Sequence, residues 1–393
     1  EVALLDAAPS SPREAPPQIV PVAVAPRFLT VGEDVLAAGD ERRVVWYAYD
    51  AKARTSGLLC DREYEGRVEA VGVCARRSVV LVEGRVEIRA LDADDADARI
   101  LSPDETDGER GEGTILSMAV VDPFLIYGTD GGRIHYYSLA DESGLDYSRV
   151  RHTAAIVRIF ANERGTRCVV VDGEAKAYVY NPALLELTPV PEFPSQYDTV
   201  LWEAPHRNVF FVFEGAAMHA YVYALETIRG PMVLKVGALT IGQSGETSTS
   251  PTLFALGDDL IPMLCHDEKI TCQSKTNGQI TTIASPVYDR DAKSGNTDLF
   301  AHHLSLLQLE KAWQIASQDG NVKHLLALAN KSMQVMHVPM SICVYRKIGD
   351  AGMVMALEEL RHVEDKKLLA GHIAKLFADY AMAQDHFFIQ PPF

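Results

Sequence analysis

Short apolar runs broken by turn residues fill most of the chain. Before about residue 295, stretches rich in Val, Ile, Tyr and Phe alternate with clusters of Gly, Asp and Pro, a pattern typical of many short strands. Beyond it Gly and Pro become rare, and Leu, Ala and Met recur at helical spacing. The polar segment 292–297 lies at the change. The pattern predicts a strand-rich domain over 1–292, a linker over 293–300 and a helical domain over 301–393.

The strand-rich part repeats. Each unit contains a small-polar turn followed by a strand with an aromatic or β-branched residue at its centre. These central residues are Trp46, Ile88, Ile134, Tyr178, Tyr221 and Ile270, at intervals of 42, 46, 44, 43 and 49 residues. A period of about 44 with about four strands per unit is typical of the blades of a WD-type β-propeller. Many of the strands are apolar on both faces, as expected where blades stack and bury both sides of each sheet.

The predicted propeller has six to seven degenerate blades. Six units are visible, and an N-terminal segment, either 19–24 or 27–31, is a candidate for a seventh that closes on the last blade. The chain has no Trp-Asp dipeptide, and its one Gly-His pair, Gly371-His372, lies in the helical part. The prediction therefore rests on spacing. Residues 93–113 form a long acidic insertion, which we expect to be a solvated surface loop.

The helical part has the pattern of paired helices. Apolar residues recur at positions i, i+3, i+4 and i+7 in three segments, which begin at Leu309, Met353 and Leu369. Gly320 and Gly349 suit helix ends, and Pro339 suits a first helical turn. Trp313 and Tyr345 are 32 residues apart, close to the period of about 34 of tetratricopeptide repeats. The segment is therefore predicted to be a TPR-like α-solenoid of about three helix pairs, cut short.

Composition excludes several classes of protein. The net charge of −17 disfavours nucleic-acid phosphates and phospholipid surfaces as partners. No apolar run reaches the ~20 residues of a membrane span, so direct membrane insertion is not expected. The six cysteines form no CxxC pair and indicate reduced intracellular thiols. The chain lacks an initiator Met and a basic leader, and we expect it to be a piece of a longer protein.

Candidate chemistry is weak throughout. The Gly-rich segment 128–132 precedes a strand rather than a helix, so a hairpin with a left-handed turn at Asp130-Gly131 is expected instead of a phosphate cradle, with His135 packed in the next strand. Cys265-His266 and Cys272 lack the second ligand pair of a zinc site. His302-His303 is expected to be linker surface, and Glu358-Glu359 a solvated helix face. Helix packing is expected for Met333, Met336, Met353 and Met355, although a methionine-rich groove for a partner stays open. No catalytic, cofactor-binding or metal-binding residues are predicted, and the partner-binding residues are not assigned.

One series of segments resembles a known family. In order they are 312–316 (AWQIA), 340–349 (MSICVYRKIG), 353–357 (MVMAL), 369–373 (LAGHI) and 383–385 (AQD). This series resembles the start of the helical region of the WD-repeat protein 19 family, whose members are subunits of intraflagellar transport complex A. The family has two N-terminal propellers followed by a long solenoid. The resemblance implies that residues 1–290 correspond to the second propeller.

The resemblance implies a non-enzymatic scaffold or adaptor. The implied role is support of retrograde ciliary transport and of the ciliary entry of membrane-protein cargo. The implied partners are other complex A subunits, with a tubby-type adaptor and membrane cargo as further contacts, at the cilium or flagellum, its base and the cytoplasm. Two alternatives remain: a vesicle-coat subunit of the same propeller–solenoid plan, and a propeller enzyme with a site in its central channel. The expected inner strands at 79–82 and 168–171 are apolar, which disfavours the enzyme.

Overall fold

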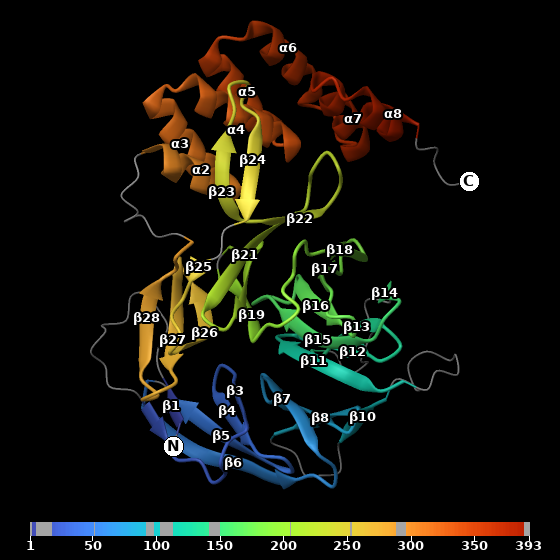
Figure 1. The fold of residues 1–393 in the computed structure, drawn as a ribbon. Helices are drawn as coiled ribbons and strands as arrows, with labels where there is room; N and C mark the ends of the chain where they lie inside the picture. The colour runs from blue at the N-terminus through green and yellow to red at the C-terminus, as the bar shows by residue number, and fades with distance from the viewer. Residues whose placement is uncertain are drawn as a thin grey trace. The chain divides into compact units, whose positions relative to one another are not determined.

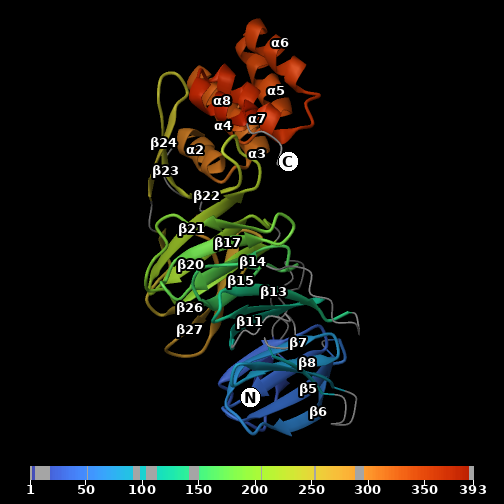
Figure 2. The same cartoon turned by 90° about the vertical axis from the view of Figure 1, so that its right-hand side faces the viewer.

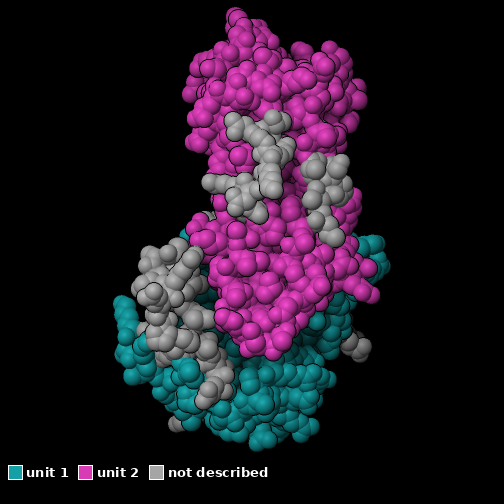
Figure 3. All heavy atoms as spheres, turned by 60° about the vertical axis from the view of Figure 1, so that its left-hand side comes forward, with its two compact units in different colours: residues 1–187 teal, residues 188–393 magenta. Residues whose placement is uncertain are grey.

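The computed structural model describes residues 2–4, 18–50, 52–91, 98–102, 113–140, 150–204, 206–251, 254–287 and 296–388. The chain divides into two compact units, residues 1–187 and 188–393 (Figure 3). The sequence places the boundary between propeller and solenoid at 292, whereas the second unit combines strands with all the described helices. None of the helices in these ranges is long and apolar enough to span a membrane.

The first unit consists of four-stranded antiparallel sheets and one short strand pair. Consecutive strands are neighbours in each sheet, as in propeller blades (Figure 1). The strand pair is β1 (Val2–Leu4) with β2 (Gln18–Val20). The four sheets are β3 (Phe28–Val31), β4 (Val35–Gly39), β5 (Arg43–Asp50) and β6 (Thr55–Glu63); β7 (Val68–Cys74), β8 (Arg77–Val82), β9 (Arg85–Ala90) and β10 (Arg99–Leu101); β11 (Ile115–Val121), β12 (Phe124–Thr129), β13 (Arg133–Ser138) and β14 (Val150–Arg151); β15 (Ile156–Ala161), β16 (Cys168–Asp172), β17 (Ala177–Asn181) and β18 (Glu186–Pro189).

The second unit carries two further blade-like groups of strands, which the parallel pair of β19 with β26 joins into one eight-stranded sheet, and also a separate hairpin and the helices. The strands are β19 (Thr199–Ala204), β20 (Val209–Glu214), β21 (Ala217–Ala224) and β22 (Met232–Lys235); β26 (Leu260–His266), β27 (Lys269–Ser274) and β28 (Ile280–Ala284); the hairpin β23 (Gly237–Ile241) and β24 (Thr247–Pro251); and β25 (Phe254–Ala255), which pairs with β21. The helices are α2 (Asn296–Ser305), α3 (Leu309–Asp319), α4 (Val322–Gln334), α5 (Val338–Ile348), α6 (Ala351–Leu360), α7 (Lys366–Leu376) and α8 (Tyr380–Phe387). The predicted fold class, a degenerate WD-type propeller followed by a helical segment, is confirmed.

Each predicted repeat centre lies in a strand that follows a hairpin turn. They occupy β5, β9, β13, β17, β21 and β27. The central strands of the sheets, such as β4, β8, β12, β16 and β20, are buried on both faces, as the apolar runs predict. In β8, Val79 and Leu81 pack in a cluster shared with the third sheet. Val80 and Val82, on the opposite face, pack in the cluster that contains Trp46 of the first sheet. Because successive side chains of a strand point to opposite faces, one strand serves two blade contacts.

Three expectations about segments need correction. Residues 28–31 form β3 and pair with β4, so this segment begins its own sheet instead of closing the last one. Part of the acidic insertion 93–113 is the strand β10, because Arg99–Leu101 pairs with β9 and Leu101 is buried; most of the rest lies outside the described residues. The expected linker 293–300 overlaps α2, in which Phe300 and Leu304, four residues apart, are fully buried and favour a helix.

The helices end and begin where the sequence indicates. Gly320 and Gly349 adopt left-handed backbone conformations at the ends of α3 and α5, where a residue without a Cβ is favoured. Pro339 lies in the first turn of α5. The side chains of Asp350 and Asp365 accept hydrogen bonds from the first backbone amides of α6 and α7. The short helix–turn–helix units predicted from periodicity are therefore present in the described part.

Candidate functional site

The Gly-rich segment 128–132 is the hairpin turn between β12 and β13, as expected. The Gly132 amide donates to the Thr129 carbonyl at 3.1 Å and closes the turn. The left-handed residue is Gly132 (φ +77°), so the expectation that Asp130-Gly131 carries the positive φ is wrong. The Gly132 carbonyl accepts a hydrogen bond from the His152 amide at 2.7 Å. The turn therefore positions the chain that leads into the next sheet.

His152 links that chain to the fourth sheet. Its Nε2 lies 3.0 Å from Oδ2 of Asp172, the almost fully buried last residue of β16. Oδ1 of Asp172 accepts from the amides of Glu174 and Lys176, both at 2.9 Å. Burial acts to raise the pKa of Asp172, but the hydrogen bonds from His152 and the amides outweigh it, so its pKa lies below the ordinary value. The pair is a structural contact between consecutive blades.

His135 is packed in β13, directly after the turn. It is 2% exposed, and its ring stacks on Tyr127 with the centroids 4.6 Å apart. The neighbouring Ile134 and Tyr136 pack in a cluster with Tyr180 of the fourth sheet. The His and Tyr side chains that follow the Gly-rich turn therefore serve packing within and between blades, as predicted.

A cavity of about 420 Å³ lies between the second and third sheets of the first unit. Its lining includes Cys74, Arg76, Arg77 and Asp122. The Cys74 thiol donates to Oδ1 of Asp122 at 3.0 Å. Burial, together with this carboxylate, raises the pKa of Cys74 to about 12, so its reactive thiolate is scarcely populated near neutral pH. Cys74 is not an activated nucleophile.

Of the two groups considered as metal ligands, the structure places one as expected and the other differently. Cys265 and Cys272 lie on β26 and β27, as expected, and both pack in the apolar core of the second unit. His302 and His303 lie in the last turn of α2, so their assignment to linker surface is wrong. His303 is buried, and its Nδ1 lies 2.8 Å from Oε1 of Gln308. Within the described residues, no three His, Cys, Asp or Glu side chains are arranged to hold a metal ion.

The half-buried position of His302 predicts a loss of stability in acid. Burial, and secondarily the neighbouring His303, lowers the pKa of His302 to about 4. In the unfolded chain its pKa is about 6.5, so the unfolded state binds the proton first as pH falls. Through His302, the free energy of unfolding is therefore highest above pH ~6.5 and falls by about 2–3 kcal/mol as pH decreases toward 4.

Denaturant unfolding at several pH values between 7 and 4 tests this, with His302→Gln as the variant. We expect the variant to flatten the loss of unfolding free energy in that window. His362→Gln, which changes an exposed histidine after α6, is the control and should retain the slope of the parent. Equal slopes in the parent and both variants would contradict the assignment.

The hairpin β23–β24 fastens the helices to the strands of the second unit. Leu239 and Ile241 of β23 pack on the helical core. Nδ2 of Asn330, on α4, donates to the carbonyls of Ser244 and Gly245 in the hairpin turn at 3.2 and 3.1 Å. The hairpin lies beside α2 and α4 in both views (Figures 1 and 2). Sequence reasoning missed it, although it lies within the longest repeat interval, the 49 residues between Tyr221 and Ile270.

A second contact lies in the loop before β22. The Ile228 amide donates to the Gln334 carbonyl at 3.0 Å, and Nε2 of His386 in α8 lies 2.7 Å from the Ile228 carbonyl. Lys366 at the start of α7 pairs with Glu226. The hairpin and this loop together contact α2, α4, α7 and α8, which makes strands and helices one compact unit.

Comparison with known proteins identifies the family. A family model described as WDR19 second beta-propeller matches residues 1–285. The chain belongs to the WD repeat-containing protein 19 family. Human WD repeat-containing protein 19 is 30% identical over 383 residues, which cover 94% of this chain and 27% of that protein. The mouse protein is 29% identical over 384 residues with the same coverage. Caenorhabditis elegans WD repeat-containing protein dyf-2 is 24% identical over 281 residues, which cover 69% of this chain and 19% of that protein.

The chain spans about a quarter of the length of these mammalian members of the WD repeat-containing protein 19 family. Among solved structures, Kluyvelomyces marxianus Hsv2 aligns with 65% of this chain and 79% of its own at 11% identity and a TM-score of 0.44. The designed protein Ika8 aligns with 65% and 70% at 12% identity and a TM-score of 0.41. Scores at this level add nothing to the family assignment.

The helical segment of this family member exposes several large apolar side chains. Met355 on α6 is 70% exposed, whereas Met333, Met336 and Met353 pack on the helical core, as expected for helix packing. The other exposed apolar residues of α7 and α8 are Leu368, Tyr380 and Phe387. Glu358, expected on a solvated face, pairs with Arg346 at 2.5 Å. An exposed apolar side chain on a charged surface is a candidate contact for a protein partner.

Proposed function

We propose that this chain is part of a non-enzymatic scaffold or adaptor subunit of intraflagellar transport complex A. In this role it supports retrograde ciliary transport and the ciliary entry of membrane-protein cargo through interfaces on its propeller and its helices. The observation that carries the proposal is the family match over residues 1–285, joined to a relative aligned over 94% of the chain, including the helical segment.

The architecture supports a role in binding proteins. Propellers offer rigid faces bordered by loops, and stacked helices offer long surfaces, both suited to partners rather than to small substrates. The division proposed from the sequence, with a propeller over 1–292 and a TPR-like solenoid over 301–393, supplies both kinds of surface. The partners proposed are other complex A subunits, a tubby-type adaptor and ciliary membrane cargo, at the cilium, its base and the cytoplasm.

Two other functions remain as alternatives. A vesicle-coat subunit shares the plan of propeller and solenoid, but the family match favours intraflagellar transport. A propeller enzyme would need converging titratable groups on its inner strands. The titratable groups described above have structural partners instead: His152 contacts Asp172, and Cys74 donates to Asp122. Membership of a propeller scaffold family supports the non-enzymatic function.

Capture from ciliated cells tests the proposal. We expect the tagged full-length protein that contains this chain to retain other complex A subunits. Recovery of vesicle-coat subunits in their place would favour the first alternative. Recovery of neither class under conditions that preserve the complex would overturn the proposed function.

A substitution on α6 tests whether the helices carry the contact. Met355→Glu places a charge on a side chain that is 70% exposed, so the stability of the fold should change by less than about 0.5 kcal/mol. We expect the variant to lose most of the captured subunits, because a buried charge without a partner is costly in an interface. Leu184→Glu, an equally charged change on an exposed leucine of the first unit, is the control. Full capture by Met355→Glu would mean that α6 lies outside the interface.

A further inference from the structure

The cavity between the second and third sheets of the first unit is not used by the function proposed above. Its volume of about 420 Å³ lies within the ~300–1,000 Å³ in which proteins hold ligands. It lies where the turn between β7 and β8, the turn between β11 and β12 and the ends of β9 and β13 come together. Turns of this kind border the faces on which propellers bind other chains.

Arg77, the first residue of β8, brings an unpaired positive charge to this cavity. It is half-buried, and in the described part of the chain its guanidinium has no hydrogen bond or ion pair. The neighbouring Arg76, which also lines the cavity, pairs with Asp34 at 3.3 Å. Partial removal of a charge from water without a partner costs free energy. The guanidinium of Arg77 therefore favours the binding of an anion.

The charge of Arg77 acts on groups within the cavity wall. Burial raises the pKa of the Tyr137 hydroxyl, and the charges of Arg99 and Arg77 oppose this rise. Burial and Asp122 raise the pKa of the Cys74 thiol, and Arg77 again opposes the rise. Because such interactions weaken with distance, the guanidinium of Arg77 lies near both groups. Since Cys74 lines the cavity, the positive field of Arg77 reaches its interior.

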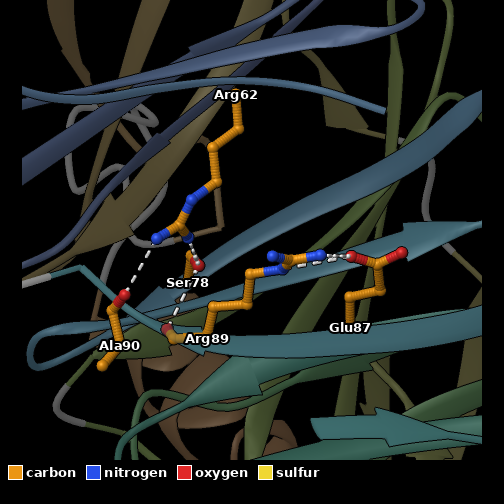
Figure 4. Close-up of polar contacts among 5 residues, drawn as sticks. All are labelled: Arg62, Ser78, Glu87, Arg89 and Ala90. Atoms are coloured by element: carbon orange, nitrogen blue, oxygen red, sulfur yellow. Dashed lines mark hydrogen bonds and ion pairs between the residues drawn. The ribbon is translucent and has the colours of Figure 1, made fainter. Parts of the chain in front are cut away.

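The wall that carries Arg77 is held by a network of side chains (Figure 4). The Arg62 guanidinium, from β6, donates to Oγ of Ser78 at 3.3 Å and to the Ala90 carbonyl at 3.1 Å. Oγ of Ser78 in turn donates to the Arg89 carbonyl at 3.2 Å. Ser78 directly follows Arg77, and Ala90 lies opposite Arg77 in the pair of β8 with β9. A wall fixed in this way loses little conformational entropy when a ligand binds.

The remaining lining residues indicate which kind of anion fits. Ala75, Ala90 and Leu139 are apolar and suit methylene groups. Asp122 also lines the cavity, and its Oδ1 accepts from the Cys74 thiol at 3.0 Å. This carboxylate repels a doubly charged phosphate more strongly than a singly charged carboxylate. A glutamate side chain, with two methylene groups and one negative charge, meets both conditions.

We propose that this cavity binds an acidic peptide of a partner protein, with a glutamate side chain inside it and the carboxylate paired with Arg77. A guanidinium can bind a carboxylate through two parallel hydrogen bonds. The net charge of −17 opposes an acidic peptide at long range, but charges farther away than ~8 Å are largely screened at physiological ionic strength. Binding of this kind does not depend on the proposed ciliary function.

Titration of the full chain with a blocked, fluorescently labelled Ala-Glu-Ala-Glu-Ala peptide tests the site. We expect saturable binding that weakens with added salt and is about tenfold weaker for the Gln counterpart of the peptide. Arg77→Gln should weaken binding of the Glu peptide about tenfold, because it removes the charge-assisted hydrogen bonds. The matched control is Arg85→Gln, at the opposite end of β9, where an exposed arginine is removed without effect on binding. Absence of saturable binding, equal binding of both peptides, or full binding by Arg77→Gln would overturn the proposal.

A second variant tests whether the peptide enters the cavity. Asp122→Asn removes a negative charge from the lining at nearly constant size, so it should strengthen binding of the Glu peptide by roughly threefold or more and leave the Gln peptide unchanged. Thermal unfolding of each variant shows whether the sheets are intact. Unchanged or weaker binding of the Glu peptide by folded Asp122→Asn would place the anion outside the cavity. Tighter binding of a phosphoserine peptide of the same length would contradict the choice of a carboxylate.

Discussion

Gly132→Ala should destabilise the protein by about 3 kcal/mol or more, one of the largest losses expected from adding a single methyl group. Two costs combine at this position. The residue has φ +77°, where a Cβ is strained, and the added Cβ would lie 2.3 Å from the His152 carbonyl oxygen and 2.7 Å from that of Ala154. Both obstacles are backbone atoms, which cannot move aside as a flexible side chain does. The segment 152–154 must shift, and the contact of His152 with Asp172 shifts with it.

The neighbouring glycine is a matched control. Gly131 lies outside the left-handed region, and a Cβ added there has Thr129 Oγ1 as its nearest neighbour, at 3.8 Å. Gly131→Ala should therefore change the unfolding free energy by less than about 1 kcal/mol. Denaturant unfolding of both variants provides the measurement. If Gly132→Ala does not fold, a soluble and folded Gly131→Ala still completes the comparison. Equal stability of the two variants would show that Gly132 is not in close contact with the backbone of residues 152–154.

Much of the fold could be predicted from repeated local signals. The residues at the repeat centres are large and β-branched or aromatic, and each lies in a strand of a different blade, so their spacing gives the blade period directly. Gly320, Gly349 and Pro339 fixed the helix boundaries because their backbone preferences act locally. Where the cause is local, the prediction and the structure agree.

The remaining features depend on contacts between distant residues. The contact of His152 with Asp172 joins a loop to a turn 20 residues later, and neither residue has a diagnostic sequence around it. The sequence predicts that His302 and His303 lie on linker surface at the start of a helix, whereas they lie in the last turn of α2, which is buried through Phe300 and Leu304. The hairpin β23–β24 has many Ser and Thr residues and no strong apolar alternation, so its burial on the helices could not be inferred from its own sequence.

The hairpin couples the helices to the last sheets of the second unit. If the proposed scaffold function is correct, partners that bind either part of this unit act on a single body. Contributors to this coupling include the apolar residues of β23, the turn 242–246, the loop before β22, and the ion pair of Lys311 on α3 with Glu268. The turn makes the closest backbone approach, because Gly245 lies directly on α4. It is therefore the position where a small change should separate the two parts.

Gly245→Ala should loosen the hairpin from α4 and destabilise the second unit by about 3 kcal/mol. Gly245 has φ +79°, and an added Cβ would lie 2.6 Å from the carbonyl carbon and from Cβ of Leu326. Because the obstacle includes the helix backbone, the hairpin turn must move away. The movement breaks the two hydrogen bonds that Asn330 donates to Ser244 and Gly245. Hydrogen exchange and limited proteolysis should then both increase in residues 237–251.

Gly230→Ala separates the clash from the backbone strain. Gly230 has φ +86°, so an alanine there is equally strained, but a Cβ would meet nothing within 4 Å. We expect it to cost about 1 kcal/mol and to leave exchange in the hairpin unchanged, since only strain is added. Asn330→Ala should fall between the two, because it removes the hydrogen bonds without displacing the turn. If Gly245→Ala costs no more than Gly230→Ala and the hairpin amides stay protected, the turn does not contact α4 closely, and the helices are held by other contacts, such as those of Ile228 and the Lys311–Glu268 pair.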